Sequence, residues 1–265
     1  MNAEESDATV ASYRPELQVR RDIPWARITM AIPGLPPFMC ARMLRSAIGE
    51  EMNKQLGHLA HADWLGKDGT GETVKRQARI YYRFTDHTPQ VFIWDSLAGE
   101  HTMALCRYLR AIRVDTREKG ALVLPVEDIQ IEQGTAILGQ NQNHRYLYEF
   151  ASSLFPTDRQ WARRPRESGM WRNHWLIDTI QGCIAGLLAG NNLHSNDITI
   201  APVSLSETRV EWSRPQRGLD TFRQGVTGRF IANVEIPDGM AIGRHGAEGY
   251  GELRMIDRFD VPKGK

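Results

Sequence analysis

The sequence is poor in cysteine and lysine and has no long apolar run. The cysteine pattern and the lack of an apolar run each argue against a class of protein. The three cysteines lie far apart, at positions 40, 106 and 183. An odd number at such spacing argues against a disulfide framework or a zinc knuckle, and a reducing cytoplasm is the expected location. No apolar run approaches the roughly 20 residues that a membrane helix needs, so we expect no membrane partner. Residues 1–22 lack the apolar core of a secretory signal and are expected to form a flexible arm.

Lysine is scarce because arginine supplies most of the positive charge. Six of the 33 basic residues are lysines, which leaves 27 arginines, and the formal net charge is +1. The hydrophobic fraction of 41% and the charged fraction of 25% are those of a soluble globular protein. Arginine binds phosphate through two parallel hydrogen bonds and stacks on bases, which suits an RNA-binding protein. A GC-rich coding sequence would favour arginine equally. The positions of the arginines therefore have to decide between RNA binding and codon bias.

The pattern of residues 23–138 predicts a β-α-β-β-α-β unit. Apolar alternation indicates strands, and apolar residues at a period of 3.6 indicate helices. The expected strands cover 25–32, 76–84, 90–96 and 121–133, the last with a possible break at Pro125, and the expected helices cover 38–56 and 98–112. The stretch 66–71 is an expected loop without Walker spacing and receives no phosphate role. This order is that of the ferredoxin-like fold, in which helices cover one face of an antiparallel sheet.

Residues 139–195 interrupt this pattern and predict a helical insertion that grips RNA. Helices are expected at 144–155 and 175–192, and a segment rich in arginine and tryptophan lies between them. We call residues 157–175 the Arg/Trp segment; its expected RNA contacts are Arg159, Trp161, Arg163, Arg164, Arg166 and Arg172. Basic residues interleaved with aromatic ones suit phosphate pairing and base stacking. The alternative is a solvated helical hairpin that its tryptophans anchor to the protein.

Residues 196–265 predict a second, partly degenerate ferredoxin-like half, which makes the fold class α+β. Strands are expected at 197–205, 207–213, 228–236 and 251–259, with helix only around 215–224. The glycine loop, residues 239–251, contains five glycines around Arg244 and His245. Glycines allow turns with positive φ and close approach of a backbone or a phosphate. We therefore expect Gly243, Gly246, Gly249 and Gly251 to contact RNA, with a plain glycine-rich hairpin loop as the alternative.

Residues 242–253, with the sequence IGRHGAEGYGEL, carry a resemblance to a known family. Glycine, basic residues and then Gly-aromatic-Gly before a terminal strand resemble the RAMP superfamily of CRISPR systems. Within it, the likeness is to the endoribonucleases that cleave repeats to mature CRISPR RNA. The stretch RYLYEFASSLFP, residues 145–156, is similar to the family's midchain aromatic stretch. The arginine-rich insertion and the compact size look most like the processing nuclease of type IV systems.

The resemblance implies cleavage of a repeat hairpin in precursor RNA without a metal ion or other cofactor. In such a reaction a ribose 2′-hydroxyl attacks the neighbouring phosphate and leaves a 2′,3′-cyclic phosphate and a 5′-hydroxyl. The sequence accordingly has no HExxH motif, no Asp-x-Asp pair and no spaced Cys/His set. The expected partners are precursor and mature CRISPR RNA, the latter retained as product, and other subunits of a CRISPR effector particle.

The expected catalytic residues are arginines from the first helix and the glycine loop. Many relatives use a histidine near the first helix, but residues 38–56 contain none, and His58 and His61 follow the helix. Arginine is a poor proton acceptor because its pKa lies above about 12, yet it neutralises a phosphorane and aligns the attacking hydroxyl. We therefore expect the scissile phosphate to lie among Arg42, Arg244 and Arg27, with His245 as the leading histidine and His58 next.

Further expected RNA contacts are Arg45, Arg223 and Arg229. Arg42 and Arg45 share one helix face at a spacing of three residues. The alternative is that the two proposed arginines, Arg42 and Arg244, are surface residues paired with Glu50, Glu51 or Glu248, since most exposed ion pairs have no function.

Three other functions remain open at this point. A RAMP subunit that binds processed RNA without cutting it would also need the glycine loop. A metabolic α+β enzyme could hold a small phosphorylated ligand in the same loop, and a protein-interaction scaffold could use the Arg/Trp segment as its interface.

Overall fold

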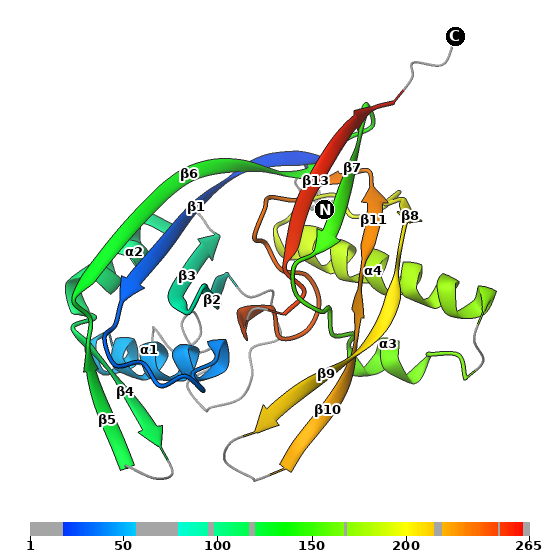
Figure 1. The fold of residues 1–265 in the computed structure, drawn as a ribbon. Helices are drawn as coiled ribbons and strands as arrows, with labels where there is room; N and C mark the ends of the chain where they lie inside the picture. Colours follow the sequence, from blue (N-terminus) through cyan, green and yellow to red (C-terminus); the bar gives the residue numbers. More distant parts are fainter. Residues whose placement is uncertain are drawn as a thin grey trace, which may run out of the picture.

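The computed structural model describes residues 18–56, 79–94, 98–116, 120–166, 169–214, 219–248 and 250–261 (Figure 1). His58, His61, Gly249, the expected loop at 66–71 and most of the expected arm 1–22 lie outside these residues. The fold is mixed α+β, as expected, with two larger sheets, two hairpins and few helices. Among the described residues no helix is long and apolar enough to span a membrane.

The first sheet has five antiparallel strands in the order β12-β6-β1-β3-β2. Its strands are β12 (Val234–Glu235), β6 (Asp128–Gln140), β1 (Arg20–Ala31), β3 (Thr88–Trp94) and β2 (Ile80–Thr85). Helices α1 (Ala41–Leu56) and α2 (Ala98–Tyr108) cover one face (Figure 1). Alternate residues of β1 explain this packing, because Ala26, Ile28 and Met30 share a buried cluster with Leu44 and Ile48 of α1.

A hairpin of β4 (Ala111–Thr116) and β5 (Gly120–Pro125) precedes β6. The helix expected over 98–112 therefore ends at Tyr108, and its last residues begin a strand instead. The strand expected over 121–133 is two strands, and the break expected at Pro125 is confirmed because this residue ends β5. Proline lacks the backbone N–H that a continuous ladder would use.

The second sheet has the order β13-β7-β11-β8, and α4 packs against it. Its strands are β13 (Leu253–Asp260), β7 (His144–Phe150), β11 (Arg229–Ala232) and β8 (Ile200–Pro202), and the helices beside it are α3 (Asp158–Ala162) and α4 (Met170–Gly190). The helix expected at 144–155 is wrong. Tyr146, Tyr148 and Phe150 are buried at every second position, which is the period of a strand.

The helix expected around 215–224 is also wrong for residues 219–224. These residues begin β10 (Leu219–Thr227), which pairs antiparallel with β9 (Ser206–Arg214) in the second hairpin. Threonine, phenylalanine and valine at 221, 222 and 226 favour a strand once a partner strand is present. The region 139–195 thus contains a strand of the second sheet as well as helices, and its boundaries as a domain stay a prediction.

One buried core joins the two sheets. It contains Phe92 and Trp94 from the first sheet, Tyr148 from the second, Ile184 from α4 and Ile242 from the glycine loop. The hydroxyl of Tyr148 accepts a hydrogen bond from the Ile236 backbone N–H at 2.7 Å and donates one to the Val234 carbonyl at 3.0 Å. Because Val234 belongs to β12 of the first sheet, this buried hydroxyl ties the two sheets together.

We predict that Tyr148→Phe lowers the free energy of unfolding by about 1–3 kcal/mol, since it leaves two buried backbone groups without a partner. Urea denaturation measures this change. Tyr108→Phe, at the end of α2, serves as the control and should unfold like the unmodified protein.

Candidate functional site

The glycine loop folds back on the residues that follow β7. The Arg244 N–H donates a hydrogen bond to the Phe155 carbonyl at 3.1 Å, and the Gly251 N–H donates one to the Ser153 carbonyl at 3.0 Å. Across the loop itself, the Ile242 N–H donates to the Gly251 carbonyl at 2.9 Å. A 3₁₀ turn, η3 (Gly246–Glu248), forms the tip of the loop. The loop is therefore a bonded element with a defined shape.

The chain's own packing requires glycine at two positions of the loop. Gly243 has φ of +82°, and a Cβ there would lie 2.2 Å from Leu154 Cδ1. Gly251 has φ of +73°, and a Cβ there would lie 2.1 Å from the Ile242 carbonyl oxygen. Gly246 is buried, and a Cβ there would fit tightly, 3.2 Å from the Ala241 Cβ and 3.3 Å from Tyr81 Cε1. RNA contact by these glycines and by Gly249 stays a prediction.

Helix α1 meets the loop at Glu248. The Arg45 Nη1 atom lies 3.1 Å from Glu248 Oε1, and the His245 Nδ1 atom lies 3.5 Å from Glu248 Oε2. The side chain of Glu248 is 10% exposed, and that of His245 is 20% exposed. His245 has φ of +62°, and its ring lies perpendicular to that of Phe155 with the centroids 6.1 Å apart. We call Arg42, Arg45, His245, Glu248 and Tyr250 the Glu248 cluster.

The charges in this cluster keep the carboxyl ionised. Burial, the largest single influence, raises the pKa of Glu248, but the contact with His245 and the charges of His245, Arg45 and Arg42 together hold that pKa below its usual value. Burial also raises the pKa of the Tyr250 hydroxyl, with Cys40 and Glu248 adding to the effect and Arg42 opposing it. The cluster thus places cations, an imidazole and a neutral hydroxyl beside one buried carboxylate.

The structure brings two of the four expected catalytic residues, Arg42 and His245, to this cluster. Arg42 lies in the first turn of α1 and acts electrostatically on Glu248 and Tyr250. Arg244 precedes His245 in the same loop. Arg27 alternates along β1 with residues that face α1, so its side chain lies on the opposite face of the sheet, where it pairs with Glu132 and lies 5.9 Å from the Phe92 ring centroid.

Sequence reasoning missed Arg83, which shares this opposite face. Arg83 lies 3.9 Å from the Phe92 ring centroid and pairs with Glu252, the residue that follows the glycine loop. Burial first, and the charge of Arg27 second, lower its pKa to about 10. Nothing in the local sequence distinguishes Arg83 from any polar residue of an amphipathic strand. Tyr250 was not singled out either, although it lies within the motif that carries the resemblance.

The Arg/Trp segment divides into an anchored side and an exposed side. Arg164 and Arg172 pair with the same carboxylate, Glu207 of β9, at 2.6 and 2.8 Å, and the Trp175 indole N–H donates to the Gln160 carbonyl. The exposed side chains include Arg159, Trp161, Arg163, Arg166, Met170 and Trp171. Two of the five arginines therefore already have an anionic partner.

The two remaining expected RNA contacts lie in the second half of the chain. Arg229, at the start of β11, pairs with Glu149 of β7 at 3.0 Å. Arg223 lies in β10, and its side chain is outside the described part of the chain.

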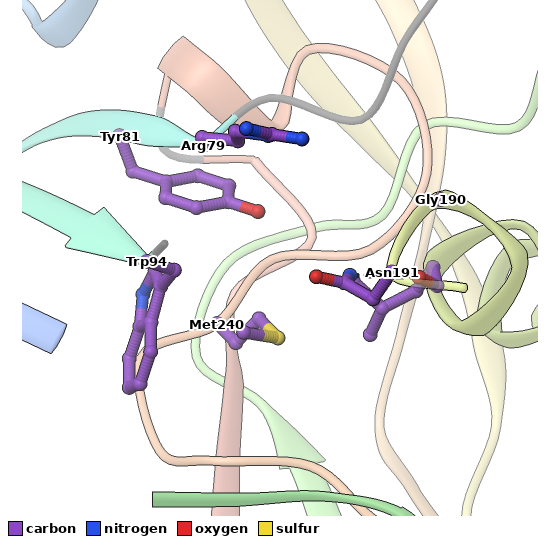
Figure 2. A pocket seen from close by; sticks show the side chains of 7 residues that line it. Arg79, Tyr81, Trp94, Gly190, Asn191 and Met240 are labelled. Atoms are coloured by element: carbon purple, nitrogen blue, oxygen red, sulfur yellow. Dashed lines mark hydrogen bonds between the residues drawn. The ribbon is translucent and has the colours of Figure 1, made fainter. Parts of the chain in front are cut away.

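A small hollow lies between the first sheet and the end of α4 (Figure 2). Arg79, Tyr81 and Trp94 line one side, and Asn191 and Met240 lie across from them. It has room for about one water molecule, which is far too little for a nucleotide. Among the described residues, no group of three or more His, Cys, Asp or Glu side chains is placed to hold a metal ion. The Glu248 cluster, where α1 and the glycine loop bring cations to one buried carboxylate, is the candidate site that we select in the part of the chain that the structure describes.

Solved structures of two Cas6b proteins are similar to this chain over most of its length. A crystal structure of Cas6b superposes with a TM-score of 0.66 at 14% identity, over 89% of this chain and all of that one. A second Cas6b, described as a CRISPR RNA processing endoribonuclease, gives 0.58 at 15% identity with the same coverage. The chain has the Cas6 fold. No family model and no curated protein matches the sequence.

The Cas6 fold confirms, at the level of fold, the resemblance carried by residues 242–253. Csf5, a type IV Cas6 crRNA endonuclease, superposes over 89% of this chain and all of its own with a TM-score of 0.47 at 11% identity. A score this low does not separate subtypes, so the type IV assignment stays a prediction.

Alanine substitutions in the glycine loop test whether packing sets its composition. We predict that Gly251→Ala lowers the free energy of unfolding by more than about 1 kcal/mol, because the new Cβ meets a carbonyl oxygen at a positive φ. Gly99→Ala in α2 is the matched control, since nothing lies within 4 Å of the new atom. It should be neutral or slightly stabilising by urea denaturation, and equal losses at both positions would contradict the packing explanation.

Proposed function

We propose that this protein is a CRISPR RNA maturation enzyme that cleaves the repeat hairpin of precursor RNA. The 2′-hydroxyl attacks the adjacent phosphate, and the products carry a 2′,3′-cyclic phosphate and a 5′-hydroxyl, with no requirement for a divalent metal ion. The observation that carries the proposal is the meeting of α1 with the glycine loop at Glu248, within a chain that has the Cas6 fold. We assign the first sheet with α1 and α2 to a ferredoxin-like half, and the second sheet to a partly degenerate one.

The proposed reaction needs cations for the crowded phosphorane and a group that transfers protons. Arg42 and Arg244 supply the cations, since guanidinium groups stay charged at neutral pH. His245 is the proton-transfer group, because imidazole alone among these side chains exchanges protons readily near pH 7. Arg45 anchors the loop through Glu248, and its expected contact with RNA stays a prediction. Arg27 lies outside the cluster, and its expected catalytic role stays a prediction as well.

RNA recognition is assigned to the exposed side of the Arg/Trp segment. A-form RNA hides its base edges in a deep, narrow groove, so arginines that follow phosphate positions are the expected means of gripping a stem. Arg159, Arg163 and Arg166 have the exposure this role needs, and Trp161 and Trp171 of the same segment are exposed as well. We further propose that the enzyme keeps its product as a subunit of an effector particle, of type IV, in the cytoplasm.

Incubation of purified protein with a repeat-hairpin RNA in excess EDTA tests the reaction directly. We predict cleavage with a 2′,3′-cyclic phosphate at one new end, and a loss of at least about 100-fold in the single-turnover rate for Arg42→Ala and for His245→Ala. Arg113→Ala, in the β4–β5 hairpin, is the control and should cleave at the rate of the unmodified protein.

RNA binding without any cleavage in this assay would overturn the nuclease proposal and favour a RAMP subunit that only binds. Binding whose affinity barely changes between about 50 and 200 mM salt would favour a small-ligand enzyme, since release of counterions from RNA makes affinity strongly salt-dependent.

The two sides of the Arg/Trp segment should respond differently to mutation. We predict that Arg163→Ala weakens RNA binding and makes the slope of log affinity against log salt shallower by about one, with no change in melting temperature. Arg164→Ala should instead lower the melting temperature, because it leaves the carboxylate of Glu207, 15% exposed, with one partner fewer. Equal loss of RNA affinity in both variants would contradict this division.

A further inference from the structure

Glu248 is a carboxylate in a place where burial alone would disfavour its charge. Its side chain is 10% exposed, and it lies between an arginine of α1 and the histidine of the glycine loop. Burying a carboxylate is unfavourable unless cations or hydrogen bonds compensate for the lost solvation. Arg45 Nη1 donates a hydrogen bond to Glu248 Oε1 at 3.1 Å and so compensates for part of the lost solvation. The other oxygen, Oε2, faces His245 Nδ1 at 3.5 Å.

The surroundings fix the orientation of the His245 ring with respect to Glu248 Oε2. The His245 carbonyl accepts backbone hydrogen bonds from Glu248 at 2.9 Å and Tyr250 at 3.4 Å, which define the turn. The ring meets Phe155 at 90°, and Phe155 in turn packs 4.7 Å from the Tyr250 ring. With Nδ1 directed at the carboxylate, Nε2 is the nitrogen directed away from it. The hydrogen bond or charge at one ring nitrogen decides which role the other can take.

We propose that Glu248 is a positioning residue for RNA cleavage, one that holds His245 Nδ1 and thereby presents Nε2 to the scissile linkage. This inference rests on the proposed function. In the reaction, the bond from the 2′-oxygen to phosphorus forms and the bond from phosphorus to the 5′-oxygen breaks. The 5′-oxygen takes its proton from His245 Nε2, the 2′-hydroxyl proton passes to water, and solvent returns a proton to the ring. The Glu248 carboxylate stabilises the protonated ring and touches no reacting atom.

A double-mutant cycle distinguishes positioning from a simple structural tie between α1 and the loop. The variants are Glu248→Gln, His245→Ala and the pair, measured by single-turnover cleavage at saturating protein and by RNA affinity. We expect Glu248→Gln to slow cleavage by about 10–100-fold with RNA affinity changed less than two-fold, and to cause no further slowing once His245 is alanine. Glu235→Gln is the matched control: this carboxylate is 16% exposed, pairs with Arg20 and lies outside the cluster, so cleavage should be unchanged.

Independent, multiplicative losses in the cycle would overturn the proposal, as would a loss of RNA affinity without a loss of rate. Because Glu248→Gln could fail to fold, a second measurement uses the unmodified protein. In ¹⁵N-histidine-labelled protein, with the His245 signals assigned by their loss in His245→Ala, the neutral ring should carry its proton on Nδ1. A proton on Nε2 would contradict the proposal. If the unmodified protein cleaves no RNA, the proposed function fails, while the ring signals still report whether Glu248 orients His245.

Discussion

The ion pair between Arg45 and Glu248 is the contact on which the candidate site depends. It joins two segments 203 residues apart in the sequence, the first helix and the glycine loop. With side chains 20% and 10% exposed, it is shielded from solvent far more than a typical surface pair. Removing one partner of such a pair leaves a charge with little solvation, so the two segments are strongly coupled. Arg42, one turn before Arg45, and His245, three residues before Glu248, are placed together as a consequence.

Two glycines shape the loop that carries Glu248 and so help to form the same contact. Gly243 and Gly251 allow the loop to pass against Leu154 and to close on Ile242, which no residue with a side chain could do. This close approach to the protein's own backbone accounts for two of the glycines without RNA. The loop is then rigid where Arg244 and Gly251 bond to residues 153–155, and His245 lies between that contact and the turn at Gly246–Glu248. A rigid loop suits a proton-transfer group, whose position has to be accurate to a fraction of an ångström.

Local patterns predicted much of the first half. Alternation in β1, the period of α1 and the turn between β2 and β3 are properties of consecutive residues, and all three elements are present. The strand β7 was mistaken for a helix because its aromatic residues run into the apolar stretch that ends at Phe155. Its identity depends on pairing with β11 and with β13, about 80 and 110 residues later, which no local window contains. Residues 219–224 likewise form a strand, β10, and not the expected helix because they pair with β9.

Local sequence also fails to show which distant residues of the site pair with one another. Arg42, Arg244 and His245 could be singled out from residue type and motif, and the placement of Arg27 could have been corrected from alternation with Ala26 and Ile28. The pairings of Glu248 and of Glu207 could not be chosen among many acidic residues, because they depend on how distant elements pack. Sequence therefore indicates which residues have suitable chemistry, and packing decides which of them act together.

The most direct test of the account is the position of the scissile phosphate in a complex. A repeat-hairpin RNA with a single 2′-deoxy nucleotide at its cut site cannot be cleaved, and the structure of its complex with the unmodified protein locates that phosphate. The account predicts the phosphate within ion-pair distance of the Arg42 guanidinium, with the 5′-oxygen within hydrogen-bond distance of His245 Nε2. A scissile phosphate bound elsewhere, with the Glu248 cluster facing no RNA, would contradict it.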